Sequence, residues 1–328
     1  MAENKTTGRH RAGFVNIIGN PNVGKSTLMN ALVGEKLSIV TAKAQTTRHR
    51  IMGIVNGDDY QIVYSDTPGI LKPNYRLQKN MMDFVDAAIG DADIILYVTD
   101  VVEKADKNAD YIARLQKLEC PVILVINKID ISDQTKVGEL MGWWKQQLPK
   151  AEIFPVSAQE KFNLENVYEA IVKNLPESPA WFDKDAFTDK NLRFFASEII
   201  REKILLNYDK EIPYSVEVEV ESFKEVERKK SFSPKDGLSA ERSFSDNGLS
   251  GEAGPSLHIS AVIYCERDSQ KGIIIGRAGS ALKRVGSMAR KDIEEFFQRP
   301  VFLELFVKVD RDWRSNQNRL RHYGYDLS

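Results

Sequence analysis

The chain has 328 residues, 42% of them hydrophobic and 28% charged, with a formal net charge of −1. The length exceeds what one hydrophobic core usually serves, so we expect two domains, and the composition excludes disordered, collagen-like and coiled-coil proteins. No apolar run is long enough to span a membrane, and the first residues lack the apolar stretch of a signal peptide, which predicts a cytoplasmic protein.

Residues 10–177 alternate short apolar runs with longer segments of helical spacing. The runs are FVNII, QIVYS, DIILYV, VILVIN and IFPVS. This alternation is typical of βαβ units around a buried parallel sheet, so we predict a doubly wound α/β domain. The segment 178–190 is rich in turn residues and is predicted to be a linker.

The first motif lies between FVNII and the helical segment STLMNALVG. It reads GNPNVGKS and matches the phosphate-binding pattern GxxxxGK[ST] in the strand-to-helix context that the pattern requires. Its glycines allow a nest of backbone N–H groups at the positive end of the helix. Lys25 brings a charge to the β- and γ-phosphates and is assigned a catalytic role, while Ser26 offers a hydroxyl to Mg²⁺. The predicted nucleotide contacts are Gly19, Asn20, Pro21, Asn22, Val23, Gly24, Lys25, Ser26 and Thr27.

The second motif, DTPG, follows the strand QIVYS. The Asp66 carboxylate at the strand end can hold Mg²⁺ through water, and the Gly69 amide can reach the γ-phosphate during catalysis. The motif alone is weak, but it becomes specific after a phosphate-binding loop. The predicted contacts are Asp66, Thr67, Pro68 and Gly69.

A polar loop, KAQTTRHR, lies between these two motifs. A threonine hydroxyl there can ligate Mg²⁺ only while the γ-phosphate is present, so the loop is expected to order with a bound nucleoside triphosphate and relax after hydrolysis. Spacing does not separate Thr46 from Thr47, and we prefer Thr47 as the catalytic metal ligand.

Two positions bear on the rate of hydrolysis. Ile70 stands where P-loop switch proteins such as Ras carry a glutamine that orients the attacking water, which predicts slow intrinsic hydrolysis. Asn22 could place a side-chain oxygen near the α- and β-phosphates and help to bind K⁺ in place of an arginine finger. The alternative for Asn22 is an ordinary turn residue.

The third and fourth motifs concern the base. Asn127-Lys128-Ile129-Asp130 follows VILVI, and the Asp130 carboxylate can accept hydrogen bonds from guanine N1–H and its amine, which selects GTP over ATP. Lys128 is expected along the base, with Asn127 bracing the loop. Ser157-Ala158 is predicted to offer a backbone N–H to guanine O6. Four motifs in this order predict a GTPase with GTP/GDP and Mg²⁺ as cofactors.

Residues 191–310 follow a different pattern. A helical pattern leads into the alternating strand VEVEVE, and later LHISAVIYC and VFLELFVKV are predicted strands. The segment 231–256 has seven Ser, four Gly and two Pro in 26 residues, which predicts a disordered insert between two strands. We therefore expect a smaller α+β domain.

A possible RNA clamp lies in the one strongly basic segment, 267–291. It has the sequence Gly276-Arg277-Ala278-Gly279, a GxxG pattern that in KH domains grips the backbone of four nucleotides. GxxG alone is very weak, but here it follows a helix and two strands and precedes a helix and a strand, among phosphate-neutralising side chains. The predicted RNA contacts are Lys271, Gly276, Arg277, Ala278, Gly279, Lys283 and Arg284.

The tail, residues 311–328, mixes arginines with aromatic residues. Arg319 and Arg321 are predicted RNA contacts, because this mixture suits stacking and phosphate contact. The alternative is a C-terminal helix packed by Trp313 and Leu320. Both interpretations stay open at this point.

Ten segments together carry a resemblance that covers nearly the whole chain. In order, these segments are GNPNVGKSTLMNAL, KAQTTRHRI, DTPG, NKID, VSA, ASEIIREK, PYSVEVE, IIIGRAGSALKRVG, ARKDIEEFF and LRHYGY. They resemble the Era family of bacterial GTPases. The resemblance implies a Ras-like P-loop GTPase domain followed by a smaller KH (type II) domain.

The same resemblance implies partners. Era-family proteins bind the 3′ end of 16S ribosomal RNA and act in assembly of the small ribosomal subunit. Peripheral contact with the cytoplasmic face of the inner membrane and a monomeric state are further expectations. The insert 231–256 departs from the family pattern and puts the local strand register in doubt.

Other protein classes fit the sequence less well. A P-loop kinase or metabolic ATPase has no need of NKID, and an RNA-binding adaptor with a degenerate nucleotide domain would carry damaged motifs. A tRNA-modifying GTPase of the related TrmE group depends on a cysteine near its C-terminus, whereas Cys265 lies in a predicted strand. Cys120 and Cys265 lack CxxC spacing, which excludes a disulfide framework or zinc cluster and predicts buried thiols.

Overall fold

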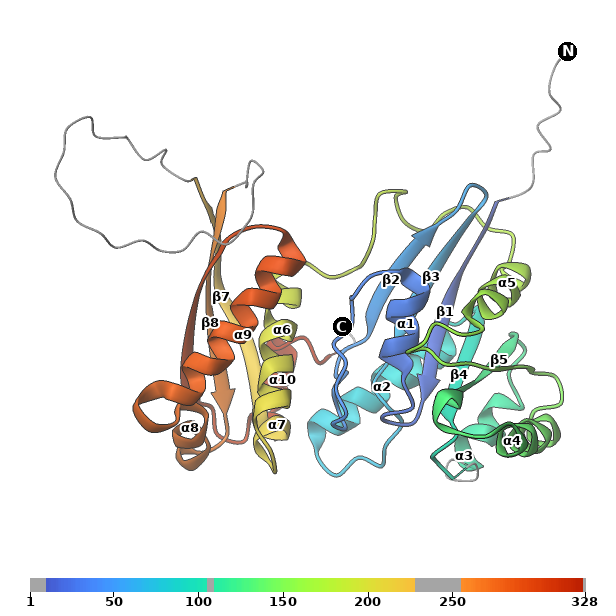
Figure 1. The fold of residues 1–328 in the computed structure, drawn as a ribbon, viewed down its shortest axis with the longest axis horizontal. Helices are drawn as coiled ribbons and strands as arrows, with labels where there is room; N and C mark the ends of the chain where they lie inside the picture. Colours follow the sequence, from blue (N-terminus) through green and yellow to red (C-terminus); the bar gives the residue numbers. More distant parts are fainter. Residues whose placement is uncertain (1–9, 105–108, 228–254, 327–328) are drawn as a thin grey trace, which may run out of the picture. The chain divides into compact units, whose positions relative to one another are not determined.

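The computed structural model describes residues 10–104, 109–227 and 255–326 (Figure 1). The described residues form two compact units. One runs up to Asn191 and resumes at Asp312, and the other spans Leu192–Arg311.

The first unit is built on a six-stranded sheet with the order β2-β3-β1-β4-β5-β6. All neighbouring pairs are parallel except β2 and β3, which are antiparallel. The strands are β1 Arg11–Gly19, β2 Ile51–Asn56, β3 Tyr60–Asp66, β4 Ile94–Asp100, β5 Val122–Asn127 and β6 Glu152–Pro155. Because β1 and β4 are central, every residue of β4 is buried, as expected for a continuous apolar run.

The strand β2 was not among the predicted strands. It pairs with β3 through a tight connection in which the Gly57 amide donates to the Tyr60 carbonyl at 2.8 Å. The sequence does carry a hairpin signal, Asn56-Gly57 between two apolar runs, and this signal could have found the strand.

Helices cover both faces of this sheet. The helices are α1 Lys25–Val33, α2 Arg76–Gly90, α3 Ala109–Leu115, α4 Gln134–Gln147 and α5 Leu164–Asn174, with a short 3₁₀ turn, η1, at Ile129–Ile131. Apolar side chains of α2, α3 and α4 form one core with β1, β4 and β5, while α1 lies beside α5. Right-handed crossovers account for this division of the helices.

The predicted linker is hydrogen-bonded to the edge of the sheet. The Ile54 amide donates to the Phe187 carbonyl at 2.9 Å, and the Thr188 hydroxyl donates to the Met52 carbonyl at 2.7 Å. An edge strand presents unpaired backbone groups, and here the segment satisfies those of β2. Most of segment 178–190 is therefore attached to the first unit.

The C-terminal segment also belongs to the first unit. It contains a 3₁₀ turn, η3, at Trp313–Ser315 and the helix α10 at Gln317–His322. Trp313 and Leu320 are fully buried in the core that includes α2. The packed interpretation of the tail is therefore confirmed, while the predicted RNA contacts of Arg319 and Arg321, both exposed, stay a prediction.

The second unit is α+β, with the sheet order β7-β8-β9. β8 runs antiparallel to β7 and parallel to β9. Figure 1 shows α6 and α9 side by side on one face of this sheet, and their apolar side chains fill the core. The elements are α6 Leu192–Asn207, α7 Ile212–Ser215, β7 Val216–Val226, β8 Ser256–Cys265, α8 Asp268–Ile275, η2 Arg277–Gly279, α9 Ser280–Phe297 and β9 Val301–Val309.

Most of the predicted insert 231–256 lies outside the described residues, but Ser256 is the first residue of β8, so the strand starts one residue earlier than expected.

Cys265 is buried as predicted, whereas Cys120 is only half-buried because it precedes β5 at the end of the sheet. That part of the prediction was wrong.

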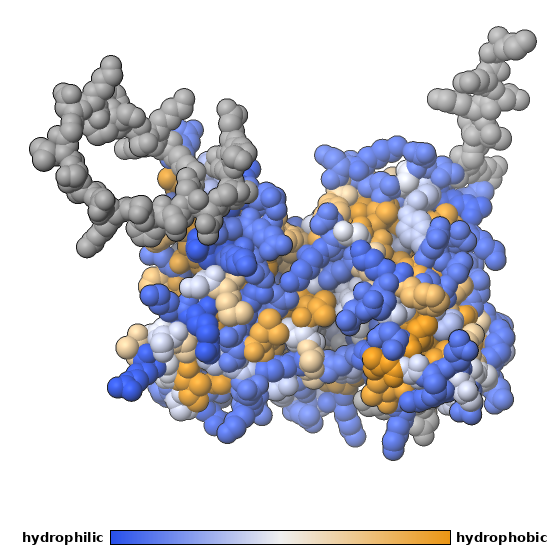
Figure 2. All heavy atoms as spheres, viewed as in Figure 1, coloured by the Kyte–Doolittle hydropathy of each residue, from blue (hydrophilic) through white to orange (hydrophobic). Residues whose placement is uncertain are grey.

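On the face drawn in Figure 2, the apolar residues of the described part of the chain form patches among hydrophilic ones. Within the described part of the chain, no helix has the length and apolar character needed to cross a membrane.

Candidate functional site

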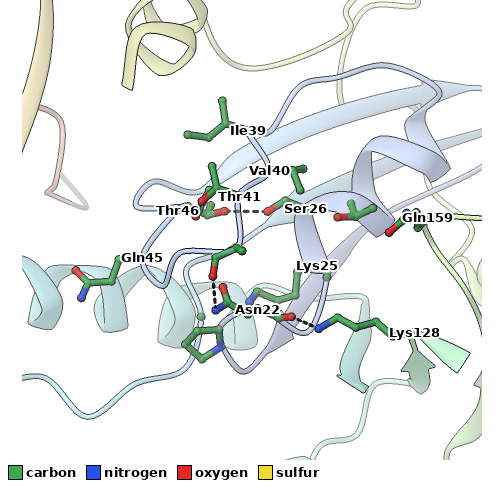
Figure 3. A pocket seen from close by; sticks show the side chains of 16 residues that line it. Asn22, Lys25, Ser26, Ile39, Val40, Thr41, Gln45, Thr46, Lys128 and Gln159 are labelled. Atoms are coloured by element: carbon green, nitrogen blue, oxygen red, sulfur yellow. Dashed lines mark hydrogen bonds between the residues drawn. The ribbon is translucent and has the colours of Figure 1, made fainter. Parts of the chain in front are cut away.

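A pocket of about 360 Å³ lies where the loop after β1 meets the α1–β2 loop, residues 34–50 (Figure 3). Nine of the predicted nucleotide-site residues line it: Pro21, Asn22, Gly24, Lys25, Ser26, Thr27, Thr47, Gly69 and Lys128. The lining residues outside the predicted set are Ile39, Val40, Thr41, Ala42, Gln45, Thr46 and Gln159. Most of these belong to the α1–β2 loop. The sequence of this loop has no motif that marks these residues as part of a nucleotide site, so only the fold shows that they line the pocket.

Two glycines of the phosphate-binding loop cannot be replaced without strain. Gly19 has φ 153° and Gly24 has φ 95°, both in the region that favours glycine. A Cβ on Gly19 would overlap the Val98 carbonyl, and one on Gly24 would overlap the Asn127 side chain. The loop therefore packs against the ends of β4 and β5 by its bare backbone.

Lys25 is buried at the start of α1, where its Nζ donates to the Asn20 carbonyl at 2.9 Å. Burial lowers the pKa of this amine to about 8, although the nearby Asp66 and Glu103 carboxylates oppose that change. The charged amine is thus poorly stabilised in this pocket, and a bound phosphate would stabilise it.

Three oxygen-bearing side chains converge at the base of the pocket. The Ser26 hydroxyl is 2.9 Å from the Thr47 hydroxyl and donates to Asp66 Oδ2 at 2.6 Å, while Thr47 Oγ1 lies 3.3 Å from the same oxygen. Asp66 is fully buried, its Oδ1 has no hydrogen-bond partner among the described residues, and burial raises its pKa. A buried carboxylate with an unused oxygen beside two hydroxyls fits Mg²⁺, which prefers oxygen ligands.

The structure separates the two adjacent threonines. The Thr46 hydroxyl donates to the Lys43 carbonyl and lies 2.6 Å from the Thr41 hydroxyl, so it is held within its own loop. Thr47, by contrast, points at Ser26 and Asp66. Thr47 is therefore the threonine placed with the other candidate metal ligands.

Asn22 connects the phosphate-binding loop to the α1–β2 loop, because its side-chain nitrogen donates to the Ala42 carbonyl at 3.0 Å. Its backbone has φ 66°, so it also makes the turn of the loop. Lys128 Nζ donates to the Asn22 carbonyl and forms an ion pair with Asp100 at 2.6 Å. Figure 3 shows the Lys128 side chain extended toward Asn22 across the pocket.

The base motif is braced as predicted from the sequence. The Asn127 side chain donates to the Val23 carbonyl and accepts from the Ala158 amide, both at 2.9 Å. Asp130 lies in η1 and is exposed, so its carboxylate is accessible to a ligand.

The amide expected to meet guanine O6 already has a partner. The Ala158 amide donates to Asn127, and the Ser157 amide donates to the Phe162 carbonyl. A contact with O6 would need to share the Ala158 amide or use that of Gln159, which also lines the pocket.

Several predicted contacts turn their side chains away from the pocket. Asn20 donates to Glu103, Thr67 donates to the Ile17 carbonyl, and Val23 is buried. These positions offer backbone groups only. Pro68 precedes Gly69, whose Cα comes so close to Pro21 that a Cβ would lie 2.7 Å from the Pro21 backbone.

The GxxG segment forms the turn η2 before α9. Gly276, Ala278 and Gly279 have φ of 73°, 49° and 77°, so three of the four residues are left-handed. A Cβ on Gly276 would lie 2.6 Å from that of Ala281, which explains the glycine. Arg277 is exposed at the tip of this turn.

A groove of about 390 Å³ lies between α9 and β9, beside this turn. Its lining residues are Gly279, Leu282, Lys283, Gly286, Ser287, Arg290, Leu303 and Leu305. Of the predicted RNA contacts, Gly279 and Lys283 line it, Arg284 is exposed on α9, and Lys271 is half-buried in α8. Leu303 and Leu305 gave no RNA signal in the sequence, because an apolar strand looks the same whether it faces a core or a groove.

Arg319 and Arg321 are exposed on α10 and belong to the first unit, whereas the GxxG groove belongs to the second. Arg321 forms an ion pair with Asp326 at 3.1 Å.

Comparison with known proteins bears on both sites. Residues 14–128 match the model of a 50S ribosome-binding GTPase family, and residues 242–314 match that of the KH domain. GTPase Era of Geotalea daltonii is 42% identical over 322 residues, covering 98% of this chain and 100% of the relative. GTPase Era of Clostridium kluyveri is 40% identical, with 96% and 99% covered.

The chain belongs to the Era family of GTPases. It has the P-loop GTPase domain and C-terminal KH domain of that family, and it is a GTP-hydrolysing enzyme. The TrmE alternative is not favoured, because these full-length matches are to Era proteins.

Two solved structures are similar over nearly the whole chain. One is Era in complex with MgGDPNP and nucleotides 1506–1542 of 16S ribosomal RNA, 37% identical with a TM-score of 0.85, covering 97% of this chain and 100% of that one. The other is a point variant of Aquifex aeolicus Era bound to GDP·AlF₄⁻, with 37% identity, a TM-score of 0.84 and the same coverage.

Proposed function

We propose that this GTPase is a nucleotide-controlled switch that binds 16S ribosomal RNA near its 3′ end and acts in assembly of the small ribosomal subunit. The observation that carries the proposal is the basic GxxG turn beside a groove in the second unit. The similar Era complex, which contains that region of 16S RNA, supports the choice of RNA.

In the nucleotide site, Lys25 and the backbone amides of the loop Gly19–Thr27 bind the phosphates. Ser26, Thr47 and Asp66, whose oxygens converge, would hold Mg²⁺. When bound, the metal neutralises charge on the β- and γ-phosphates. Gly69 lies against Pro21 and offers its amide to the γ-phosphate, while Asp130 binds the guanine base with Lys128 along its face.

We also propose K⁺ as an activating ion at Asn22. The support is the position of Asn22, which lines the pocket and bonds to the Ala42 carbonyl, so an ion here would contact both the phosphate-binding loop and the α1–β2 loop. Such an ion adds positive charge beside the phosphates, in the place of an arginine finger.

In the RNA site, the turn from Gly276 to Gly279 contacts the backbone of the RNA, since its two glycines permit close approach. Arg277, Lys283 and Arg284 neutralise phosphates, and the apolar wall of Leu303 and Leu305 receives bases. Lys271 contributes positive charge nearby. Arg319 and Arg321 are proposed as additional phosphate contacts from the other unit.

We propose a GTP-binding domain at residues 10–177 and a KH domain at residues 191–310, joined by the linker 178–190. The C-terminal tail covers residues 311–328. A monomeric state, a cytoplasmic location and peripheral membrane contact stay predictions.

The deciding experiment measures binding of an RNA with the sequence of nucleotides 1506–1542 and of a scrambled RNA, each with GDP and with a non-hydrolysable GTP analogue. We expect tight, sequence-dependent binding that changes with the nucleotide. Equal binding of both RNAs would contradict the proposal. Crosslinking of the protein to RNA in cells, with the crosslinked sites mapped on ribosomal RNA, tests the same assignment during ribosome assembly.

A further inference from the structure

We infer that the C-terminal segment, residues 312–326, positions the α1–β2 loop for the GTPase reaction, so that its docking and the inward position of Thr47 are coupled. The inference rests on the proposed role of Thr47 as a metal ligand.

The two residues directly after Thr47 are held by this segment. The Arg48 guanidinium lies over the Trp313 ring, 6.0 Å from its centroid, and Arg48 is only 1% exposed. The His49 ring stacks on Tyr325 with centroids 4.2 Å apart and an interplanar angle of 14°. Consecutive Cα atoms are about 3.8 Å apart, so Thr47 cannot move far while both contacts with aromatic rings persist.

The same segment also contacts the region after the DTPG motif. The Asn80 side chain on α2 donates to the Tyr325 carbonyl at 2.7 Å, and Arg76 donates to Gln317 at 2.8 Å. The Arg314 guanidinium lies 4.8 Å from the Tyr75 ring centroid. The segment therefore touches both chain regions that follow candidate γ-phosphate contacts.

These two regions also meet each other at this place, because the Tyr75 hydroxyl donates to Gln45 in the α1–β2 loop at 3.0 Å. The residue Tyr75 thus contacts the loop on one side and the C-terminal segment on the other.

The docking is a packed interface. Trp313, Leu320 and Tyr325 are at most 1% exposed and share a core with Leu77, Met81 and Phe84 of α2. Burial of two large aromatic rings and a leucine makes a site that resists small displacements. An outward movement of the loop must therefore repack the segment or release it.

The described arrangement has Thr47 inward and the segment docked. Thermodynamic coupling is reciprocal, so a ligand that draws Thr47 inward must also favour docking. GTP with Mg²⁺ is such a ligand under the proposed function, whereas GDP makes no demand on Thr47.

Hydrogen exchange of the full-length protein tests the coupling. Peptides covering 312–326 should exchange more slowly with Mg²⁺ and a non-hydrolysable GTP analogue than with GDP, by about fivefold or more, the lower range of allosteric coupling. Peptides from α5 should not differ. Equal exchange of 312–326 in both states would overturn the inference.

Nucleotide affinities of variants test the positioning role. Tyr325→Leu removes the ring that holds His49, and it should weaken the GTP analogue by about fivefold or more while GDP affinity stays within twofold. Tyr325→Phe keeps the ring and should restore GTP-analogue affinity. Asn318→Ala, exposed on α10, is the matched control.

A merely structural segment predicts a different result. Tyr325→Leu would then lower both affinities together or neither, and either outcome would overturn the inference. The His49→Ala variant approaches the same contact from the loop, and its effect should not add to that of Tyr325→Leu. Thr47→Ala tests the proposed function separately. If Thr47 is a metal ligand, this variant must lose its preference for the GTP analogue, whether or not the C-terminal segment positions the loop.

Discussion

The Ser26 hydroxyl donates to Asp66 Oδ2 at 2.6 Å, which joins the first turn of α1 to the last residue of β3. β1 and β3 are parallel neighbours, so the loop that follows one and the carboxylate that ends the other meet at the same sheet edge. This contact gives the pocket its candidate metal site.

Replacing Asp66 by Asn should raise the Mg²⁺ concentration needed for GTP hydrolysis. The change removes the buried negative charge but keeps a side chain of the same size. Loss of a group that supports a bound metal typically lowers metal affinity ten- to a hundredfold. A magnesium titration of GTP hydrolysis measures the effect. The exposed Asp59→Asn variant is the control, and an unaltered titration for Asp66→Asn would remove this residue from the metal site.

Nucleotide binding should weaken as pH rises through about 8. Burial lowers the pKa of Lys25 to about 8, so the charged form that attracts phosphate dominates below that pH and is lost above it. Binding at pH 8 should take up protons, detectable by calorimetry in buffers of different ionisation enthalpy. Affinity that is constant between pH 7 and pH 9.5, without proton uptake, would contradict the assignment.

Asp130→Asn should change base specificity. The carboxylate accepts both guanine donors, and each hydrogen bond to a charged group contributes about 1.5 to 3 kcal/mol, so GTP affinity should fall roughly a hundredfold or more. Xanthine nucleotide should gain relative preference. A competition titration in which the variant keeps the wild-type preference for GTP over XTP would rule out this role.

Intrinsic hydrolysis should be slow and faster in potassium than in sodium. Ile70 is buried and offers no polar group to orient water, whereas Asn22 lines the pocket. Turnover in the two chlorides at equal ionic strength measures the effect. Equal rates would remove the cation proposal, and full stimulation of Asn22→Ala would remove only Asn22 from it.

Replacing Arg277 and Ala278 together by aspartate should sharply reduce RNA affinity. The new charges stand where phosphates are expected, and the salt dependence should become shallower by about one unit of slope for the lost arginine. Ala278 has φ 49°, which aspartate tolerates, so the turn should survive. GTP affinity should not change.

Filter binding with the 3′-terminal 16S fragment at several salt concentrations measures this effect, alongside binding of a fluorescent GTP analogue. Arg299→Asp reverses a half-exposed arginine charge in the same unit, outside the groove residues, and controls for the reversal of one arginine charge. Wild-type RNA affinity in the double variant would mean that the GxxG turn is only a solvated surface.

The order of the four nucleotide motifs and the GxxG turn could be predicted because each depends on local chemistry. Positions 19 and 24 require glycine because of their backbone angles and close contacts. Asp66 and Asn127 are the last residues of β3 and β5, the strands that the sequence predicted directly before their motifs. The family resemblance could be drawn from the same short segments, which lie in order along the chain.

Other features depend on contacts between distant segments, and only the tertiary structure decided them. Spacing could not separate Thr46 from Thr47, because the choice depends on which hydroxyl meets Ser26 and Asp66. Trp313 and Leu320 fit an exposed stacking surface as well as a core, since an aromatic residue serves both. Their burial against α2 follows from the partners that the fold supplies.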